Sequence, residues 1–249
     1  MDKEISNAGS RPGTVARPLA MPGLFALLGS RVTLFLLFQC VIALVLHSWT
    51  RSEGYWLLTA TLTNLVSIAL LFYMFRSEGR SFLSLFRFDR QTYRKDIRVF
   101  ILLALLTGPV AFVPNYLLSK WLWADAAIPY EMMFRPVEVW LAIVLLVAFP
   151  VTIAFAEIAT YFGYIMPRLI GGLRSKWLAV ALPVLFLSLQ HMTLPFIPDL
   201  RFILYRGLVF LPFAALIGIA LYKRPALFPY FAILHGVMDL GTAVMFLPR

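Results

Sequence analysis

The chain has 249 residues, of which 61% are apolar and only 14% are charged, and its mean hydropathy is +0.84. Soluble domains usually contain about 45–50% apolar and about 25% charged residues, so a soluble fold of this composition would lack the polar residues needed to cover its surface. A lipid bilayer removes that difficulty because it solvates an apolar exterior. The composition therefore indicates an integral membrane protein with no separate soluble domain.

The net charge of +10 is a property that nucleic-acid-binding proteins also show. Here, however, the basic residues are concentrated in short loops between apolar runs, where they meet anionic lipid headgroups. No basic stripe with interleaved aromatic residues occurs in a water-exposed segment. We therefore expect membrane lipids as partners and no nucleic acid. The single cysteine, Cys40, excludes a disulfide within the chain.

Residues 1–31 are polar and contain Pro, Gly and Arg, which predicts a disordered N-terminal tail. A helix needs about 20 residues to cross the hydrocarbon core. Residues 32–249 contain apolar runs of about that length and predict one all-α domain, a polytopic membrane helix bundle with about seven transmembrane helices. The runs are Val32–Trp49, Tyr55–Phe75, Val99–Leu118, Val139–Met166, Trp177–Met192, Phe202–Tyr222 and Phe228–Leu247.

The distribution of Lys and Arg predicts the orientation. With the N-terminus inside, the inner segments carry four in the tail, seven in 76–98, three in 168–176 and two at 223–224. This asymmetry favours a cytoplasmic N-terminus, and we expect a multi-pass protein of a bacterial-type plasma membrane. The loop 76–98 mixes Phe and Leu with Arg, which is typical of an amphipathic segment on the membrane surface or of a solvated connector. The outer segments carry Arg51, Lys120, Arg135, Arg201, Arg206 and Arg249.

Ionisable side chains are rare inside membrane spans, because a charge at the bilayer centre costs about 2.5–3.5 kcal/mol on insertion scales. Among the acidic residues, only Glu157 and Asp239 lie well inside apolar runs. His191 closes the fifth run and His235 lies inside the seventh, four residues before Asp239 and so on the same helix face. Each residue alone is compatible with a packing or hydrogen-bonding role. Together the four indicate a functional site.

Three chemistries fit these four residues. The first is hydrolysis, with a carboxylate as general base and a histidine that positions water. The second is a divalent metal site, whose ligands would be Glu157, His191 and His235; the lack of an HExxH motif counts against it. The third is a proton or ion relay in a small transporter, although the chain shows no inverted repeat. No nucleophile motif of the GxSxG type is present.

The same residues resemble the signature of the CAAX-processing and bacteriocin-processing (CPBP) intramembrane proteases. That signature is Glu-Glu-x-x-x-Arg-Gly, then Phe-x-x-x-His, then His-x-x-x-Asn/Asp, each on a separate helix. Here 157–164 (EIATYFGY), 187–191 (LSLQH) and 235–239 (HGVMD) resemble the three motifs in order. The resemblance covers about 139–247, and the first three spans add nothing specific. It is incomplete, because Ile158, Phe162 and Leu187 replace the second Glu, the Arg and the Phe.

The resemblance implies a glutamate-type intramembrane endopeptidase without a cofactor. Glu157 would activate water as the general base, and His191 would help to position that water. His235 and Asp239 would line the oxyanion side, with Asp239 either orienting His235 or acting in its protonated form. The resemblance implies a peptide or protein substrate, and it allows for a substrate that carries a lipid modification. The main alternative is a non-catalytic membrane protein of the same fold with a binding or immunity role, because the motif's supporting Glu–Arg pair is lost; a small transporter is the second alternative.

Overall fold

The computed structural model describes residues 19–247. This part of the chain is helical and contains no β-strand, so the all-α prediction is confirmed. Six of its helices are long and apolar enough to cross a membrane, which identifies a multi-pass integral membrane protein. These six helices are Met21–Leu46, Trp56–Ser77, Tyr93–Trp123, Val139–Gly172, Leu200–Lys223 and Pro225–Val244.

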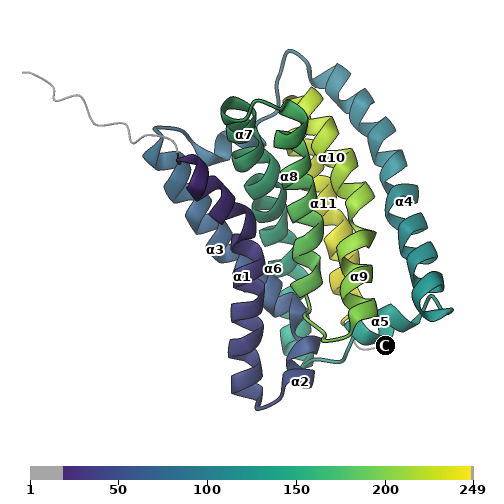
Figure 1. Ribbon diagram of the computed structural model, residues 1–249. Helices are drawn as coiled ribbons and strands as arrows, with labels where there is room; N and C mark the ends of the chain where they lie inside the picture. Colours follow the sequence, from purple (N-terminus) through teal and green to yellow (C-terminus); the bar gives the residue numbers. More distant parts are fainter. Residues whose placement is uncertain (1–18, 248–249) are drawn as a thin grey trace, which may run out of the picture.

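The long helices run side by side between two ends of the molecule, with α2 and α5 at one end and α7 at the other (Figure 1). Among the short elements, η2 is a π-helix, whereas η1, η3 and η4 are 3₁₀-helices. In chain order the elements are α1 (Met21–Leu46), α2 (Trp49–Gly54), α3 (Trp56–Ser77), η1 (Phe82–Phe86), α4 (Tyr93–Trp123), α5 (Ile128–Met133), α6 (Val139–Ile158), η2 (Ala159–Ile165), α7 (Met166–Gly172), α8 (Lys176–Leu189), η3 (Gln190–Thr193), α9 (Leu200–Val209), α10 (Leu211–Lys223), η4 (Pro225–Leu227) and α11 (Phe228–Val244).

The expected span at Trp177–Met192 is formed by α8 and η3. Helix α8 has only 14 residues, which is why it is not among the six long apolar helices. It still packs against α10 inside the bundle and leads from the α7 end toward the α2 end (Figure 1). Helix α1 starts at the α7 end and α11 finishes near α5, so the described segment begins and ends on opposite sides of the bundle (Figure 1).

Helix α1 begins at Met21, earlier than the expected start of the first span at Val32. The predicted boundary of the polar tail therefore lies too late in the chain, while residues 1–18 of that tail lie outside the described residues. The reason is Arg31, which interrupts the apolar run in the sequence but is fully buried in the bundle. The leucines that precede it pack in the core: Leu24, Leu27 and Leu28.

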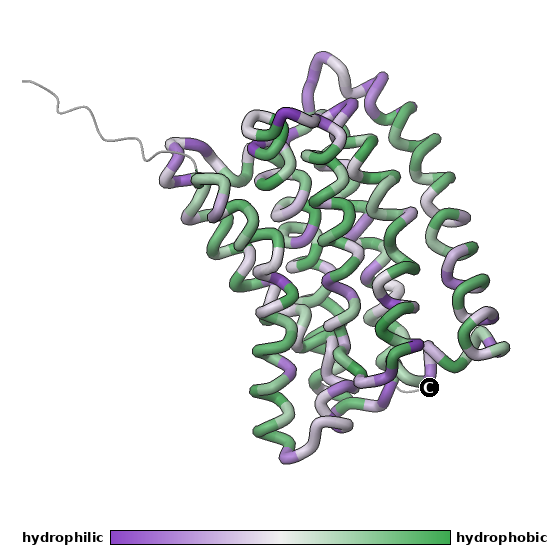
Figure 2. Tube along the Cα trace, viewed as in Figure 1, coloured by the Kyte–Doolittle hydropathy of each residue, from purple (hydrophilic) through white to green (hydrophobic). Residues whose placement is uncertain are grey.

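The outer surface of the bundle is apolar. Figure 2 shows hydrophobic residues along the helices and hydrophilic residues gathered toward the two ends. Helix α4 is the extreme case, because only 6% of its most apolar window is buried in the protein, and Leu105 and Phe112 are 70% and 67% exposed. An apolar surface of this extent requires lipid as its solvent. Helix α4 therefore contacts lipid along most of its length and packs on α9 and α10 with the rest.

The loop 76–98 is anchored to the bundle by the aromatic residues of η1. Phe82 is buried and lies edge-on to Phe72, and Phe86 packs on Phe155 of α6 and on Phe228 of α11. The loop is therefore more than a solvated connector, because Phe82 and Phe86 pack into the protein. Its basic residues remain outside, at the end of the bundle that also carries the turn after α7 (Figure 1).

We call this end the basic end: it carries the Lys and Arg residues of 76–98, 168–176 and 223–224. The opposite end carries Arg51, Lys120, Arg135 and Arg201. Arg206 was expected among the outer-loop charges, but it is 4% exposed within the span Leu200–Lys223 and is not a loop residue. Its removal from the count, together with that of the buried Arg31, leaves the asymmetry between the two ends intact.

At the basic end, Glu78 ties α3 to η2 and α7. Arg168 Nε donates to Glu78 Oε1 at 3.0 Å, and the Tyr164 hydroxyl donates to the same oxygen at 2.7 Å. The Arg168 guanidinium also lies over the Tyr164 ring, 3.4 Å from its centroid. Burial alone would raise the pKa of the Glu78 carboxyl, but the hydrogen bonds from Arg168 and Tyr164, with the charges of Arg168 and Arg80, bring that pKa below its ordinary value.

Orientation can be tested with two single-cysteine variants in a Cys40→Ala background. Gln91 at the basic end and Asp125 at the opposite end are both exposed. Because positive charge is retained on the cytoplasmic side, we expect a membrane-impermeant maleimide to label Asp125→Cys in intact cells and Gln91→Cys only after permeabilisation. The reverse labelling pattern would show that the basic end faces outward.

The depressed pKa of Glu78 predicts a stability contribution that is present above the pKa of an unfolded Glu, about 4.3, and is lost as the pH falls through the lower folded value. We expect Glu78→Gln to lower the unfolding midpoint in detergent at pH 7, and the difference from wild type to shrink as the pH falls toward 3. The exposed Glu131→Gln serves as the control and should leave the midpoint unchanged. A constant difference over that pH range would contradict the assignment.

Candidate functional site

Glu157 lies near the end of α6, directly before the π-helix η2. Turns of π-helix are rare and often occur at functional sites. Because α6, η2 and α7 form one helical span, Val139–Gly172, Glu157 lies well inside the bundle rather than at its surface. Its side chain is almost completely buried. The carboxylate oxygens must therefore find their hydrogen-bond partners within the protein.

Three elements supply the partners of the Glu157 carboxylate. Gln190 Nε2, from η3, donates to Oε2 at 2.7 Å. Arg31 Nη2, from α1, lies 3.6 Å from the same oxygen. His235 Nε2, from α11, lies 3.4 Å from Oε1. One oxygen is thus held by the amide and the guanidinium, and the other faces the histidine.

Arg31 is satisfied on every side by polar groups inside the apolar bundle. Its Nε donates to Gln190 Oε1 at 2.8 Å, Nη1 donates to Ser67 Oγ at 3.2 Å, and Nη2 donates to Asn64 Oδ1 at 3.0 Å. The Gln190 amide therefore accepts from Arg31 with its oxygen and donates to Glu157 with its nitrogen, which fixes its orientation. This network lets a full ion pair exist without water, which is the condition under which a buried pair is tolerated.

His235 Nε2 lies between two carboxylates, 3.4 Å from Glu157 Oε1 and 3.2 Å from Asp239 Oδ2. His235 and Asp239 lie on one face of α11, as their spacing of four residues predicts. The adjacent Gly236 allows α11 to approach α6, because a Cβ there would lie 3.0 Å from the Pro150 carbonyl oxygen. A larger residue would push the helices apart and move His235 away from Glu157.

His191 lies in η3, at the end of α8. Its Nδ1–H donates to the Leu187 carbonyl oxygen at 2.9 Å, since a carbonyl can only accept, and this leaves Nε2 as the ring's acceptor. The ring stacks on Phe210, with centroids 3.8 Å apart and planes inclined by 21°. The backbone bond and the stacking together fix the position of the imidazole.

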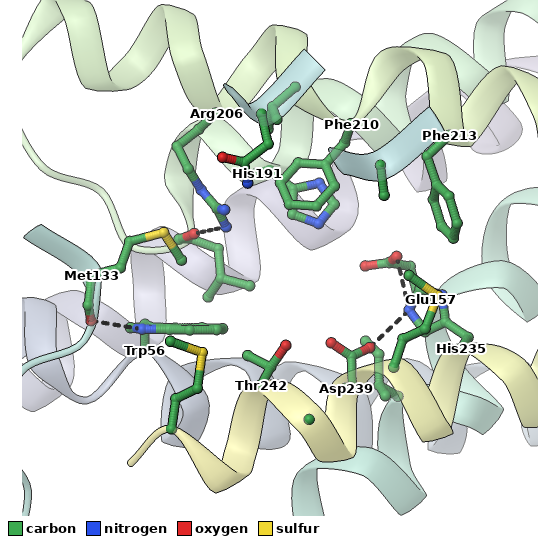
Figure 3. Close-up of a pocket in the computed structure, with 18 of the residues that line it drawn as sticks. Trp56, Met133, Glu157, His191, Arg206, Phe210, Phe213, His235, Asp239 and Thr242 are labelled. Carbon is green, nitrogen blue, oxygen red and sulfur yellow. Dashed lines mark hydrogen bonds and ion pairs between the residues drawn. The ribbon is translucent and has the colours of Figure 1, made fainter. Parts of the chain in front are cut away.

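The structure brings all four predicted residues to one cavity of about 390 Å³, lined by Glu157, His191, His235 and Asp239 among others. Figure 3 shows Glu157, His235 and Asp239 together at one side of the cavity and Trp56 with Met133 at the other. The cavity thus extends from the buried carboxylate toward the end of the bundle that carries α5. A largely apolar pocket of this size with a few convergent polar groups is the usual form of a binding or active site.

The first three spans contribute more to the site than sequence reasoning indicated. Helix α1 supplies Arg31, α3 supplies Asn64 and Ser67 to its network, and Trp56 and Asn115 line the cavity. Gln190 and Arg206 were also missed. Two signals existed in the sequence: the arginines at 31 and 206 interrupt apolar stretches, and a carboxylate inside a membrane protein needs a cationic or amide partner.

A metal site was one of the three chemistries open at the outset. Within residues 19–247, no group of three or more His, Cys, Asp or Glu side chains is arranged to hold a metal ion. The contacts of His235 with the two carboxylates, at 3.2 and 3.4 Å, are hydrogen-bond or ion-pair distances. The three side chains therefore lie in direct ion-pair contact and form an acid–base cluster.

The chain matches no family model, no curated protein and no solved structure.

The ion pair between Arg31 and Glu157 can be tested by a double-mutant cycle. Removing one partner of a buried pair strands the other charge and typically costs about 3–5 kcal/mol, so Arg31→Met should strongly lower the free energy of unfolding in detergent. The double variant Arg31→Met/Glu157→Gln should lose clearly less than the sum of the two single losses. Additive losses would show that the two side chains do not stabilise each other.

Proposed function

We propose that this protein is an intramembrane endopeptidase of the CPBP type, which hydrolyses a peptide bond with water activated by Glu157. The observation that carries this proposal is the meeting of Glu157, His191, His235 and Asp239 at one cavity inside an apolar helix bundle. Such ionisable groups are energetically costly inside a membrane protein, and their presence therefore favours a functional role. A carboxylate base with two imidazoles is also a sufficient set for hydrolysis by general acid–base catalysis.

In the proposed reaction, Glu157 takes a proton from the water that attacks the peptide carbonyl carbon and later gives that proton to the leaving amine. His191 accepts a hydrogen bond from the same water through Nε2, because its Nδ1–H is already bonded to Leu187. His235 Nε2 lies between the carboxylates of Glu157 and Asp239 in the structure, and in this proposal its N–H turns toward the oxyanion as that charge develops. Asp239 orients His235, in agreement with the distance of 3.2 Å between them.

Arg31 and Gln190 act in this proposal as positioning residues. Arg31 and Gln190 contact Oε2 of Glu157. Oε1 is therefore the oxygen that faces His235. The family signature has an Arg where this chain has Phe162, which is buried in the apolar core. Arg31 supplies a cation from a different helix, and this supports a working site in spite of the incomplete motif.

Substrate would reach the site from the end of the bundle that carries α5, because the cavity extends in that direction. With the basic end in the cytoplasm, that end faces outward. Helix α4 forms the remaining wall through Ala111 and Asn115, and it is the helix least covered by the rest of the protein. An apolar peptide segment could therefore approach from the lipid beside α4.

A non-catalytic binding role for the same cavity is the second candidate. The observation in its favour is that both oxygens of Glu157 already have protein partners. In this case the network would stabilise the bundle, and the cavity would hold a ligand without cutting it.

The test compares wild type with Glu157→Gln in lipid nanodiscs, using a library of apolar peptides that includes prenylated C-terminal peptides. We expect wild type to cleave, and Glu157→Gln to be slower by about 10²–10⁴-fold, the usual contribution of a general base. The control is Glu138→Gln, which changes a carboxylate outside the cavity that bonds the Tyr55 hydroxyl at 2.7 Å. It should cleave as wild type does.

The other outcomes separate the rival functions. Cleavage that survives Glu157→Gln would reject Glu157 as the base, and cleavage abolished by a chelator would indicate a metal site. If no peptide is cut by folded wild type, the non-catalytic role is favoured. The unfolding midpoint of each variant is measured in parallel, so that loss of structure is not mistaken for loss of chemistry.

A further inference from the structure

Arg206 is the second arginine buried in the bundle, and its surroundings differ from those of Arg31. It lies on α9 and is 4% exposed. Its Nη2 donates to the Leu194 carbonyl oxygen at 2.6 Å, and its guanidinium carbon lies 4.8 Å from the Phe210 ring centroid. Its Nε is buried without a hydrogen-bond partner among residues 19–247. Arg206 lines the cavity, on the side away from Glu157 (Figure 3).

A guanidinium carries five N–H groups and a permanent charge. Arg31 uses its donors on Gln190, Ser67 and Asn64 and has Glu157 as its counter-ion. Arg206 pairs with no acidic side chain of the described chain, residues 19–247. An unpaired charge in an apolar environment is strongly unfavourable. The contrast indicates that the partner of Arg206 comes from outside the described residues.

We propose that Arg206 binds the carboxylate of a ligand whose remaining part is apolar. The guanidinium fork matches a carboxylate in shape and charge. Arg206 is the one Lys or Arg side chain among the described residues that line the cavity, so it offers one positive charge to the carboxylate of the ligand. The wall around it is apolar and aromatic and includes Trp56, Met133 and Phe210, which suits an apolar body rather than a polar headgroup.

Phe210 links this site to the proposed catalytic group. The Arg206 guanidinium lies over the Phe210 ring, and the Phe210 ring also stacks on the His191 ring. A ligand bound at Arg206 therefore lies in the same cavity as Glu157, with its apolar body available to extend toward the carboxylate. Binding of this ligand requires no hydrolysis, so the inference goes beyond the proposed function and is independent of it.

The experiment uses 8-bromooctanoate as the probe and its methyl ester as the uncharged control. Bromine quenches tryptophan fluorescence on contact, and Trp56 lies in the cavity wall. Wild type in nanodiscs should bind the acid about tenfold or more tightly than the ester, the size expected for a charge-assisted hydrogen-bonded pair. Trp56→Phe should remove most of the saturable quenching and so report on the location, because Trp56 is the one tryptophan among the described residues that line the cavity.

Arg206→Gln should abolish the preference for the acid, whereas Arg206→Lys, which keeps the charge but loses the fork, should retain part of it. Equal binding of acid and ester by wild type would overturn the proposal, and that comparison needs no variant to fold. Unchanged preference in a folded Arg206→Gln would also overturn it. The acid-over-ester preference is measured without peptide cleavage in both wild type and Arg206→Gln. This test therefore remains valid if the protease proposal fails.

Displacement identifies the source of the carboxylate. Octanoate is compared with octanamide, and an apolar tetrapeptide with a free C-terminus is compared with its C-terminal amide. Displacement of the probe by octanoate alone indicates a fatty acid, and displacement by the peptide acid alone indicates a chain end; both results support a carboxylate site. Displacement by the amides as well as the acids would contradict it, because an apolar pocket without a role for Arg206 would bind all four.

Discussion

A carboxylate inside an apolar helix bundle lacks the bulk water that would solvate it at a surface, and Glu157 therefore needs polar partners from the rest of the structure. Its partners come from α1, η3 and α11, which are far apart in the sequence. Each partner is in turn held by others, such as Asn64 and Ser67 behind Arg31. The polar network therefore fixes the positions of α1 and α11 relative to α6, because Arg31 and His235 both contact Glu157.

The two buried arginines, Arg31 and Arg206, have different roles. Arg31 is enclosed by the protein's own acceptors and has a counter-ion, so its role is to hold Glu157. Arg206 has one carbonyl partner and faces open space in the cavity (Figure 3). Arg31 stabilises the fold around Glu157, whereas Arg206 is the residue that we propose binds the ligand. This distinction follows from counting donors and acceptors, and it holds for either of the two candidate functions.

Hydropathy and the rarity of membrane-embedded charges were sufficient to predict the all-α bundle and to select Glu157, His191, His235 and Asp239. They could not locate Arg31, because an arginine beside an apolar run resembles a loop charge until its partners are known. They assigned Arg206 to an outer loop for the same reason. Gln190 carries no signal of its own, since an uncharged amide becomes significant only when the fold places it between Arg31 and Glu157.

The apolar run Val99–Leu118 of helix α4 corresponds to a length of about 30 Å, which matches the thickness of the hydrocarbon core of a bilayer. The charged residues of the first turn of α4 lie before this run, at the basic end. Pro109 and Pro114 lie within α4, and each removes a backbone hydrogen bond, so this is where the helix bends most easily. Ala111 and Asn115, in the same stretch, line the cavity. A change in the bend of α4 at these prolines therefore moves this wall, so the width of the cavity depends on the angle of the bend.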